Sequence, residues 1–254
     1  MHFDPSKIRG PLLVSMIQAE NPEKILYAVR RGHEEGCGAF GFQFCQVLPA
    51  FRDAETVRRV FTAMEGKPVY VTNYRGGKNA GKSDEELAEE LLFLARNGAS
   101  FCDVMGDYYC RTPGELTSDA AAVEKQKDLV ARIHDAGAAV LMSSHVLKFT
   151  PPEEVLRIAL TQQSRGADIV KIVTAADTEE EERENLKTTL LLKERLSVPF
   201  LFLSGGSHCR LHRTLGISLG CSFALCVPEH DALSTKSQPL LSDMRTLGSL
   251  LGER

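Results

Sequence analysis

The chain has 254 residues, of which 43% are hydrophobic and 25% charged, so it is long enough for one large barrel or two small domains around a sizeable core. A formal net charge of −4 argues against nucleic acid or an anionic membrane as the main partner. The seven cysteines include no C-x-x-C pair, which is typical of reduced thiols. With no signal-peptide pattern and no apolar run of membrane-spanning length, we expect a cytoplasmic protein.

Short apolar runs recur along the chain and predict eight strands. They begin at Leu12, Ala39, Val69, Phe101, Ala139, Ile169, Phe200 and Ser222. Each run is followed by a helical or loop segment, and several helical segments end on similar glycine-containing phrases ("GCGA", "NGAS", "DAGAA", "RGAD"). This punctuation is typical of repeated βα units.

Two intervening segments show helical spacing most clearly. "DEELAEELLFLARNGA" repeats its leucines at three and four residues and ends at Gly98, and "AAAVEKQKDLVARIHDAGA" ends in the same way at Gly137. Asn21 followed by Pro22, and the threonine and prolines at 150–152, predict two helix starts, because proline is tolerated in the first turn.

Eight such units without a linker-like segment favour a single (β/α)₈ TIM barrel, with residues 1–254 as one catalytic α/β domain. A doubly wound open sheet is the alternative. No glycine-rich dinucleotide fingerprint follows any of the strands, so the barrel is preferred.

Lys171 lies in "GADIVKIV", a run that otherwise predicts a fully buried strand. An ammonium inside a barrel either pairs with a buried carboxylate or serves as a nucleophilic amine. Burial disfavours the charged form, so a lysine there could supply the neutral amine that attacks a carbonyl. Barrel active sites gather where the strands end, and Arg75 and His145 follow the third and fifth strands there. A Schiff-base lysine is therefore favoured.

The segment "MSSHVLKFTPPEEV…GADIVKI" resembles the histidine and lysine segments of type I 3-dehydroquinate dehydratase. The resemblance puts the catalytic histidine at His145, the "TP" helix start at Thr150 and Pro151, and the Schiff-base lysine at Lys171. It implies a TIM barrel whose lysine condenses with a ring ketone, while the histidine moves protons.

The likeness continues along most of the chain and implies further site residues. "VTNYRGG" places the substrate-binding arginine of the third strand at Arg75, and "LHRTLGISLGCSFAL" places the carboxylate-binding arginine at Arg213. The closing loop "STKSQPLLSDMRTL" supplies Ser234 and Gln238 for substrate binding. Ser15, on the first strand, is expected to support the site.

The implied activity is that of a hydro-lyase, which converts 3-dehydroquinate to 3-dehydroshikimate in the shikimate pathway of aromatic amino acid biosynthesis. The partner is then a small cyclic hydroxyketone carboxylate, and no cofactor or metal is expected. The resemblance also implies a homodimer.

Several family positions carry other residues in this chain. A glutamate and an arginine on the second strand are replaced, in the preferred register, by Gln43 and Cys45. Asn79 stands where a glutamate orients the histidine, and Met105 where the fourth strand is acidic. The hydroxyl-binding half of the site is thus rebuilt from uncharged groups. An amide can orient an imidazole but cannot stabilise its charged form.

Two other functions stay open. One is a related Schiff-base lyase with an altered substrate: the uncharged second strand would suit a differently hydroxylated cyclic acid, and "SGGSH" at 204–208 could cradle the phosphate of a sugar phosphate, as in a Schiff-base aldolase. The chain could also be a non-catalytic homologue that binds a metabolite, although a pure sensor has no need for a buried amine.

Overall fold

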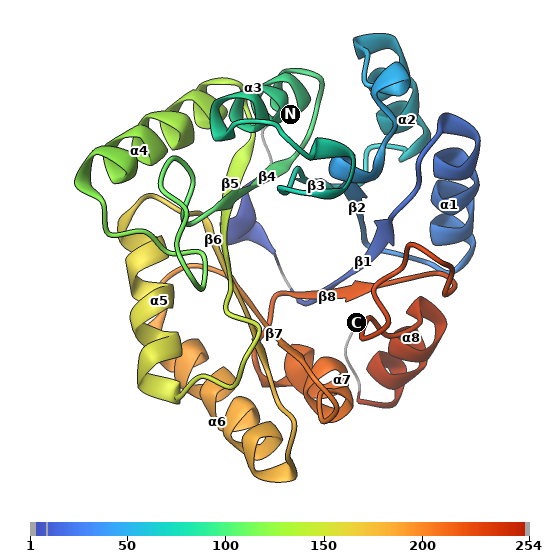
Figure 1. Cartoon of the computed structure of the whole chain (residues 1–254). Helices are drawn as coiled ribbons and strands as arrows, with labels where there is room; N and C mark the ends of the chain where they lie inside the picture. Colours follow the sequence, from blue (N-terminus) through green and yellow to red (C-terminus); the bar gives the residue numbers. More distant parts are fainter. Residues whose placement is uncertain (1–3, 9, 252–254) are drawn as a thin grey trace.

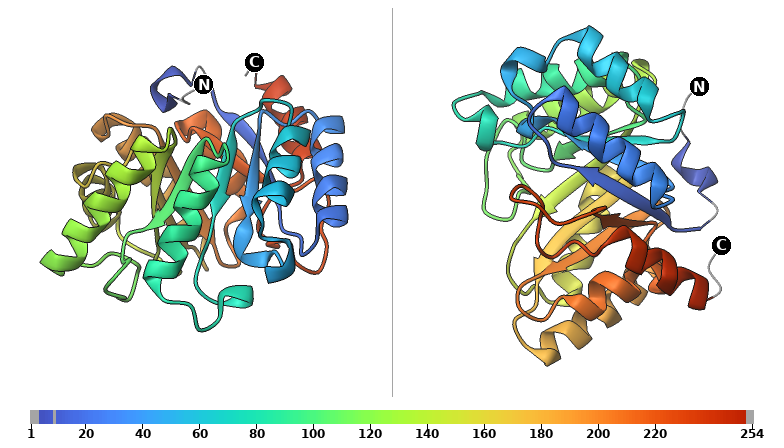
Figure 2. Two further views of the ribbon diagram at one scale, coloured as in Figure 1. Left: turned by 90° about the horizontal axis from the view of Figure 1, so that it is seen from above. Right: turned by 90° about the vertical axis from the view of Figure 1, so that its right-hand side faces the viewer.

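The computed structural model describes residues 4–8 and 10–251. Its eight strands are all parallel and hydrogen-bonded in the order β7-β6-β5-β4-β3-β2-β1-β8. The backbone N–H of Ser222 donates to the carbonyl of Phe200 at 2.9 Å and links the starts of β8 and β7. Helices surround this barrel on the outside (Figure 1 and Figure 2). The predicted (β/α)₈ TIM barrel is confirmed.

The apolar runs located the strands well, because seven of the eight begin at the predicted residue. β8 begins at Phe223, one residue later than predicted. The strands are β1 (Leu12–Ile17), β2 (Ala39–Gln43), β3 (Val69–Thr72), β4 (Phe101–Met105), β5 (Ala139–His145), β6 (Ile169–Ala175), β7 (Phe200–Gly205) and β8 (Phe223–Cys226).

The α-helices are α1 (Pro22–Glu34), α2 (Ala54–Ala63), α3 (Asp84–Arg96), α4 (Ala120–Asp135), α5 (Pro152–Ser164), α6 (Glu179–Arg195), α7 (Arg210–Leu219) and α8 (Leu241–Leu250). Short 3₁₀ turns lie at η1 (Pro5–Lys7), η2 (Phe44–Gln46), η3 (Pro49–Phe51) and η4 (Gly77–Asn79). Of the described helices, none has the length and apolar character needed to cross a membrane.

Local signals explain where the helices begin and end. Pro22 is the first residue of α1, and the side chain of Asn21 accepts a hydrogen bond from the backbone of Lys24 at 3.0 Å. Gly98 and Gly137 follow α3 and α4 with positive φ angles of 108° and 89°, which glycine adopts without strain.

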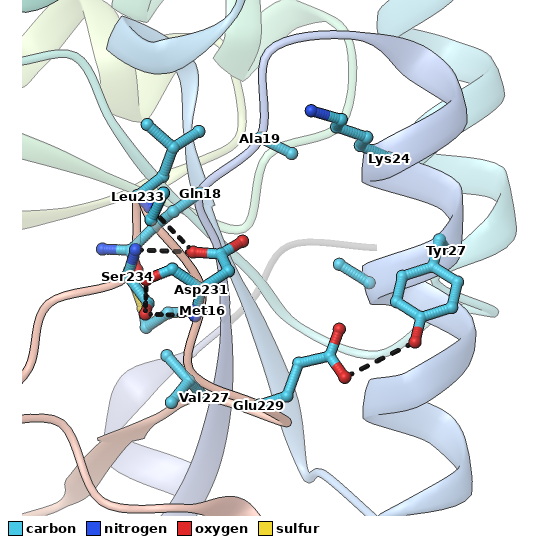
Figure 3. Close-up of a pocket in the computed structure, with 12 residues that line it drawn as sticks. Met16, Gln18, Ala19, Lys24, Tyr27, Val227, Glu229, Asp231, Leu233 and Ser234 are labelled. Carbon is cyan, nitrogen blue, oxygen red and sulfur yellow. Dashed lines mark hydrogen bonds between the residues drawn. The ribbon is translucent and has the colours of Figure 1, made fainter.

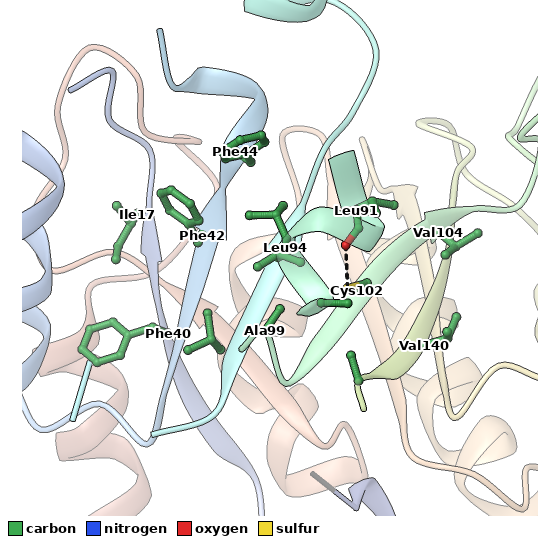
Figure 4. Packing of buried hydrophobic residues seen from close by; sticks show 14 of the residues in the cluster. Ile17, Phe40, Phe42, Phe44, Leu91, Leu94, Ala99, Cys102, Val104 and Val140 are labelled. Carbon is green, nitrogen blue, oxygen red and sulfur yellow. Dashed lines mark hydrogen bonds between the residues drawn. The ribbon is translucent and has the colours of Figure 1, made fainter. Parts of the chain in front are cut away.

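Strand side chains alternate between two apolar layers. Every second residue, such as Tyr70 on β3 and Phe101 on β4, points into the barrel and packs in one cluster. The intervening residues, such as Cys102 and Val140, pack against the helices in an outer cluster (Figure 4). The phase of this alternation decides which polar side chain at a strand end reaches the interior.

Candidate active site

A cavity of about 240 Å³ opens among the carboxyl ends of the strands. Its lining contains Gln43, Tyr74, His145, Lys171, Arg213 and Gln238, together with apolar residues and small polar ones. Aspartate and glutamate are missing from this lining, whereas a lysine, an arginine and a histidine contribute to it. The cavity is therefore suited to an anion.

Lys171 points into this cavity from the middle of β6, and its side chain is almost fully buried. Nζ donates hydrogen bonds to Asp103 Oδ2 at 3.0 Å, to Tyr70 Oη at 3.0 Å and to Tyr74 Oη at 2.5 Å. An ammonium has three N–H donors, and these three acceptors satisfy all of them. The pairing with a buried carboxylate makes the burial of this cation tolerable.

Asp103, on β4, is the centre of the polar cluster at the bottom of the cavity. Its Oδ1 accepts a hydrogen bond from Ser143 Oγ at 2.5 Å, and its Oδ2 accepts from the hydroxyls of Tyr70 and Tyr74 as well as from Lys171. Burial alone would raise the pKa of Asp103, but the charges of Lys171 and His145 and these hydrogen bonds hold it below its usual value. Asp103 is thus held as a carboxylate.

Burial, and then the charge of Asp103, raise the pKa values of Tyr70 and Tyr74 well above their usual range. Both tyrosines therefore remain neutral phenols.

His145, the last residue of β5, is held by the loop that follows β4. Its Nδ1 is 2.6 Å from Oε2 of Glu115, and its backbone N–H donates to the same oxygen at 3.2 Å. Because a carboxylate only accepts, Nδ1 carries the proton and Nε2 is left as the basic nitrogen. The His145 ring also meets the edge of Tyr74, with ring centroids 5.1 Å apart.

Arg213, in the first turn of α7, contributes the third basic group. Its Nε donates to the carbonyl of Ser204 at 2.5 Å, which fixes the guanidinium at the cavity. Burial lowers its pKa to about 10. Within residues 4–8 and 10–251 it forms no salt bridge, so its charge is available for an anionic ligand.

Comparison with known proteins gives the family. The type I 3-dehydroquinase family model matches residues 45–254. The chain belongs to the type I 3-dehydroquinase family. A 3-dehydroquinate dehydratase of Aromatoleum aromaticum is 26% identical over 205 residues, which are 79% of this chain and 73% of that protein. A 3-dehydroquinate dehydratase of Neisseria meningitidis serogroup C is 33% identical over 201 residues, covering 67% of this chain and 78% of that protein.

Solved structures of type I 3-dehydroquinases share the fold. The 3-dehydroquinate dehydratase of Geobacillus kaustophilus superposes with a TM-score of 0.81 at 18% identity, covering 96% of this chain and 92% of that one. The type I enzyme of Clostridium difficile gives a TM-score of 0.79 at 15% identity, covering 95% and 92%. At these identities the likeness concerns the fold.

Within this family member, five of the predicted site residues line one cavity. They come from five different parts of the barrel and are Gln43, His145, Lys171, Arg213 and Gln238. Convergence from such distant segments is what a catalytic site at the strand ends requires.

Arg75, by contrast, does not line the cavity, and this corrects its prediction as a substrate-binding residue. Its guanidinium bonds to Asp84 at 2.7 Å and to Asp107 at 2.7 Å on the outer side. Tyr70 points inward, and Thr72 and Tyr74 line the cavity in the same phase, so the next residue, Arg75, points away.

Asn79 was also expected to orient the histidine, and this prediction is wrong. Its Nδ2 donates to Asn73 Oδ1 and to the carbonyl of Tyr74, both at 2.8 Å, and its Oδ1 accepts from Arg52 at 2.6 Å. Glu115 takes the orienting position beside His145 instead.

The acidic residue of β4 lies two positions before the expected one. Met105 packs in the outer cluster, whereas Asp103 reaches the interior. Phe101, Asp103 and Met105 are alternate residues of β4, so all three would be expected to point inward. The strand ends at Met105, however, and the alternation does not continue there. Cys45 is buried in η2 and does not line the cavity.

Two predicted serines also lie elsewhere. Ser15 points from β1 toward α1, where a Cβ added at Gly32 would come within 2.8 Å of its Oγ. Ser234 lines a neighbouring pocket, and its hydroxyl accepts from the backbone of Asp231 at 2.8 Å (Figure 3). The next residue, Thr235, lines the catalytic cavity and exchanges hydrogen bonds with Gln18.

Four residues of the site were not predicted from the sequence: Asp103, Tyr70, Tyr74 and Glu115. The inward phase of β3 and β4 could have indicated the first three. Nothing local marks Glu115, which reaches His145 from a loop where its own φ is +52°. Among the described residues, no cluster of three or more His, Cys, Asp or Glu has an arrangement that could hold a metal ion.

Proposed function

We propose that this chain is a Schiff-base-forming hydro-lyase that converts 3-dehydroquinate to 3-dehydroshikimate, a reaction of the shikimate pathway. The observation that carries the proposal is the meeting of Lys171, His145 and Arg213 at one cavity in a member of the type I 3-dehydroquinase family. The relatives whose names are given above are 3-dehydroquinate dehydratases. The catalytic unit is the single barrel domain, residues 1–254.

Lys171 is the nucleophile of this reaction. Its neutral amine attacks the ring ketone, and loss of water gives an iminium, which draws electrons from the neighbouring carbon–hydrogen bond. The bond between carbon and hydrogen then breaks more easily, because the electron pair it leaves is delocalised onto the iminium nitrogen.

His145 acts as base and then as acid. Nε2 takes the proton from the carbon next to the iminium, and the resulting imidazolium returns a proton to the departing hydroxyl. Glu115 stabilises the imidazolium that exists between these two steps. Hydrolysis of the conjugated iminium releases the enone and restores the amine.

Arg213 binds the substrate carboxylate, which does not react. A guanidinium can donate two parallel hydrogen bonds to a carboxylate, and Arg213 has no competing acidic partner among the described residues. Gln238 and Gln43 are amide groups that can bind further oxygens of the substrate.

One part of the cavity wall, which contains Gln43, Thr72, Tyr70 and Tyr74, is uncharged. This part of the wall favours a second candidate, a lyase of the same type acting on a cyclic ketone acid with different hydroxyl groups. Each charge-assisted hydrogen bond to a hydroxyl is typically worth about 1.5–3 kcal/mol, roughly twice a neutral one. Such a wall selects hydroxyls by position rather than by strong attraction.

A sugar-phosphate aldolase is less well supported. The backbone N–H of Ser207 donates to the carboxylate of Asp177 at 2.9 Å, and that of His208 donates to the carbonyl of Ala176 at 2.9 Å. Donors that are already engaged, one of them by an anion, make a poor phosphate cradle.

The test is direct. Incubation with 3-dehydroquinate should produce the enone absorbance, and borohydride reduction should leave an adduct on Lys171 that mass spectrometry detects. Lys171→Ala should abolish both, and Lys171→Arg should not restore them, because a guanidinium stays protonated. An adduct that persists in Lys171→Ala would place the nucleophile elsewhere. An adduct without turnover of 3-dehydroquinate would favour the altered substrate, and binding without an adduct would favour a metabolite-binding protein.

The family resemblance also supports a cytoplasmic homodimer. Light scattering coupled to size-exclusion chromatography tests the dimer, and fractionation of the source cells tests the location.

A further inference from the structure

The inference concerns the protons of Lys171 and rests on the proposed function. A lysine must lose a proton before its nitrogen can attack a ketone, and the ketone oxygen must gain protons before it leaves as water. In the described part of the chain, Nζ has three hydrogen-bond acceptors: Asp103, Tyr70 and Tyr74. The proton therefore leaves the lysine through one of them.

His145 is not one of these acceptors. Its Nδ1 is engaged by Glu115, and its side chain contacts the cluster through the ring edge of Tyr74. The proposed reaction already uses His145 for proton transfer at carbon. A separate group at the nitrogen would leave His145 available for that step.

Tyr74 is the acceptor best placed for this role. Its contact with Nζ is the shortest of the three at 2.5 Å, and its hydroxyl donates in turn to Asp103 Oδ2. The three groups thus form a continuous chain, from N–H to phenol oxygen and from phenol O–H to carboxylate oxygen.

Tyr74 also forms the side of this polar cluster that faces the cavity. Tyr74 is partly exposed, lines the cavity, and contacts both Lys171 and His145. Tyr70 makes the same two kinds of contact but is 1% exposed, and its ring is stacked on Phe101 with centroids 5.1 Å apart. Tyr74 therefore has better access to the oxygen of a bound ketone.

We propose that Tyr74 is a third catalytic residue, which relays protons between the Lys171 nitrogen, the carboxylate of Asp103 and the carbinolamine oxygen. Burial and the charge of Asp103 keep its phenol protonated, so Tyr74 passes protons through its oxygen rather than acting as a phenolate base.

The step balances within the cluster. The ammonium of Lys171 gives one proton to Tyr74 Oη as the phenolic proton moves to Asp103, which becomes a neutral acid. The amine lone pair then forms the nitrogen–carbon bond, and the carbonyl π pair moves to oxygen. This oxygen receives one proton from the new nitrogen and one from Asp103, both through Tyr74. It leaves as water when the nitrogen lone pair forms the C=N bond. The products are an iminium, a carboxylate and one water.

The experiment measures iminium formation by itself. Protein and 3-dehydroquinate are mixed in a quenched-flow instrument, reduced with borohydride at successive times, and the adduct is quantified by mass spectrometry. Tyr74→Phe keeps the ring against His145 but removes the relay oxygen. We expect the rate of adduct formation to fall about 10²-fold or more, while the final extent of adduct approaches that of the unaltered protein.

Tyr70→Phe is the matched control, because it removes the same two types of hydrogen bond from the same cluster. It should slow adduct formation by less than about 10-fold, since Tyr74 still relays the proton. Adduct formation in D₂O should be slower for the unaltered protein, and this solvent effect should diminish in Tyr74→Phe. A structural role alone would not produce that change.

Adduct formation by Tyr74→Phe within about threefold of the unaltered protein would overturn the assignment, as would an equal loss in Tyr70→Phe. A rate without solvent dependence in the unaltered protein would also overturn it, even if Tyr74→Phe failed to fold. If the unaltered protein forms neither adduct nor enone, the proposed function itself fails. The two failures are therefore distinguishable.

Discussion

Asp103→Asn is the perturbation that tests the buried cluster most severely. The side chains of Lys171 and Asp103 are 4% and 0% exposed, and the carboxylate accepts hydrogen bonds from four donors. An asparagine keeps only one acceptor oxygen. Its NH₂ group takes the place of the other oxygen and cannot accept the hydrogen bonds that were donated to it. The ammonium of Lys171 then loses its counter-ion in a water-poor interior.

Removal of one partner of a buried ion pair typically costs about 3–5 kcal/mol of stability. For a chain of this length each kcal/mol lowers the melting temperature by about 2–4 °C, so we expect Asp103→Asn to melt roughly 6–20 °C lower. Lys171→Met should also be destabilised, because it leaves Asp103 as the uncompensated charge. The double variant should lose less than the sum of the two, by about 2–3 kcal/mol.

Thermal melts and urea unfolding, followed by circular dichroism, measure all four proteins of this cycle. Ser143→Ala is a suitable control, because it removes one hydrogen bond to Asp103 without changing the charge. The reasoning about the buried pair would be refuted if Asp103→Asn lost less than about 1 kcal/mol. It would also be refuted if the losses in the double variant simply added.

Four further predictions follow from the site and from one surface pair. His145→Ala should still form a borohydride-trapped adduct but lose roughly 10²–10⁴-fold in kcat, since only the proton transfers at carbon fail; loss of the adduct would contradict this division of roles. Arg213→Ala should chiefly raise KM, by about 10²-fold, because it binds a carboxylate that does not react; a change confined to kcat would argue against that assignment. Glu115→Gln should lower kcat by about 10-fold, the difference between a charged and a neutral hydrogen bond to the imidazolium, and an unchanged kcat would remove Glu115 from the mechanism. The hydrogen bond that His134 donates to the carboxylate of Asp168 raises the pKa of His134, so this pair stabilises the fold below the unfolded value of about 6.5, and the contribution is lost as the pH rises through the higher folded value. His134→Gln should reduce the change in urea midpoint between about pH 6 and pH 9, and an unaltered pH dependence would contradict the pairing.

Much of the fold was predictable because its signals are local. Apolar runs placed the starts of seven strands, and Asn21 and Pro22 marked the beginning of α1. A proline ring and a capping side chain act within one helical turn, so they do not depend on the rest of the molecule. The signal from Lys171 is local as well, because a charged residue inside an apolar strand needs a special reason that can be recognised from that strand alone.

The polar partners of the site were harder to predict, because each comes from another strand or loop. Glu115 is 30 residues away from His145 along the chain and reaches it through an irregular loop. The partner of Lys171, Asp103, is 68 residues distant. Motif spacing constrains neither contact, since the path of the loop and the closure of the barrel bring the groups together.

The sequence by itself determined that this chain is a βα-repeat barrel with Lys171 inside the sixth strand and His145 at the end of the fifth. Only the tertiary structure decided which neighbouring side chains face them. Adjacent residues of a strand point to opposite sides. A shift of the alternation by one residue would therefore exchange all inward-facing side chains of the strand for its outward-facing ones. Here Tyr70 packs inward on Phe101, which brings Tyr74 to the cavity and turns Arg75 outward to Asp84 and Asp107. Which side chains of β3 point inward depends on the packing inside the closed barrel. The interior can hold the ring of Tyr70 only if the side chains of the neighbouring strands leave room for it.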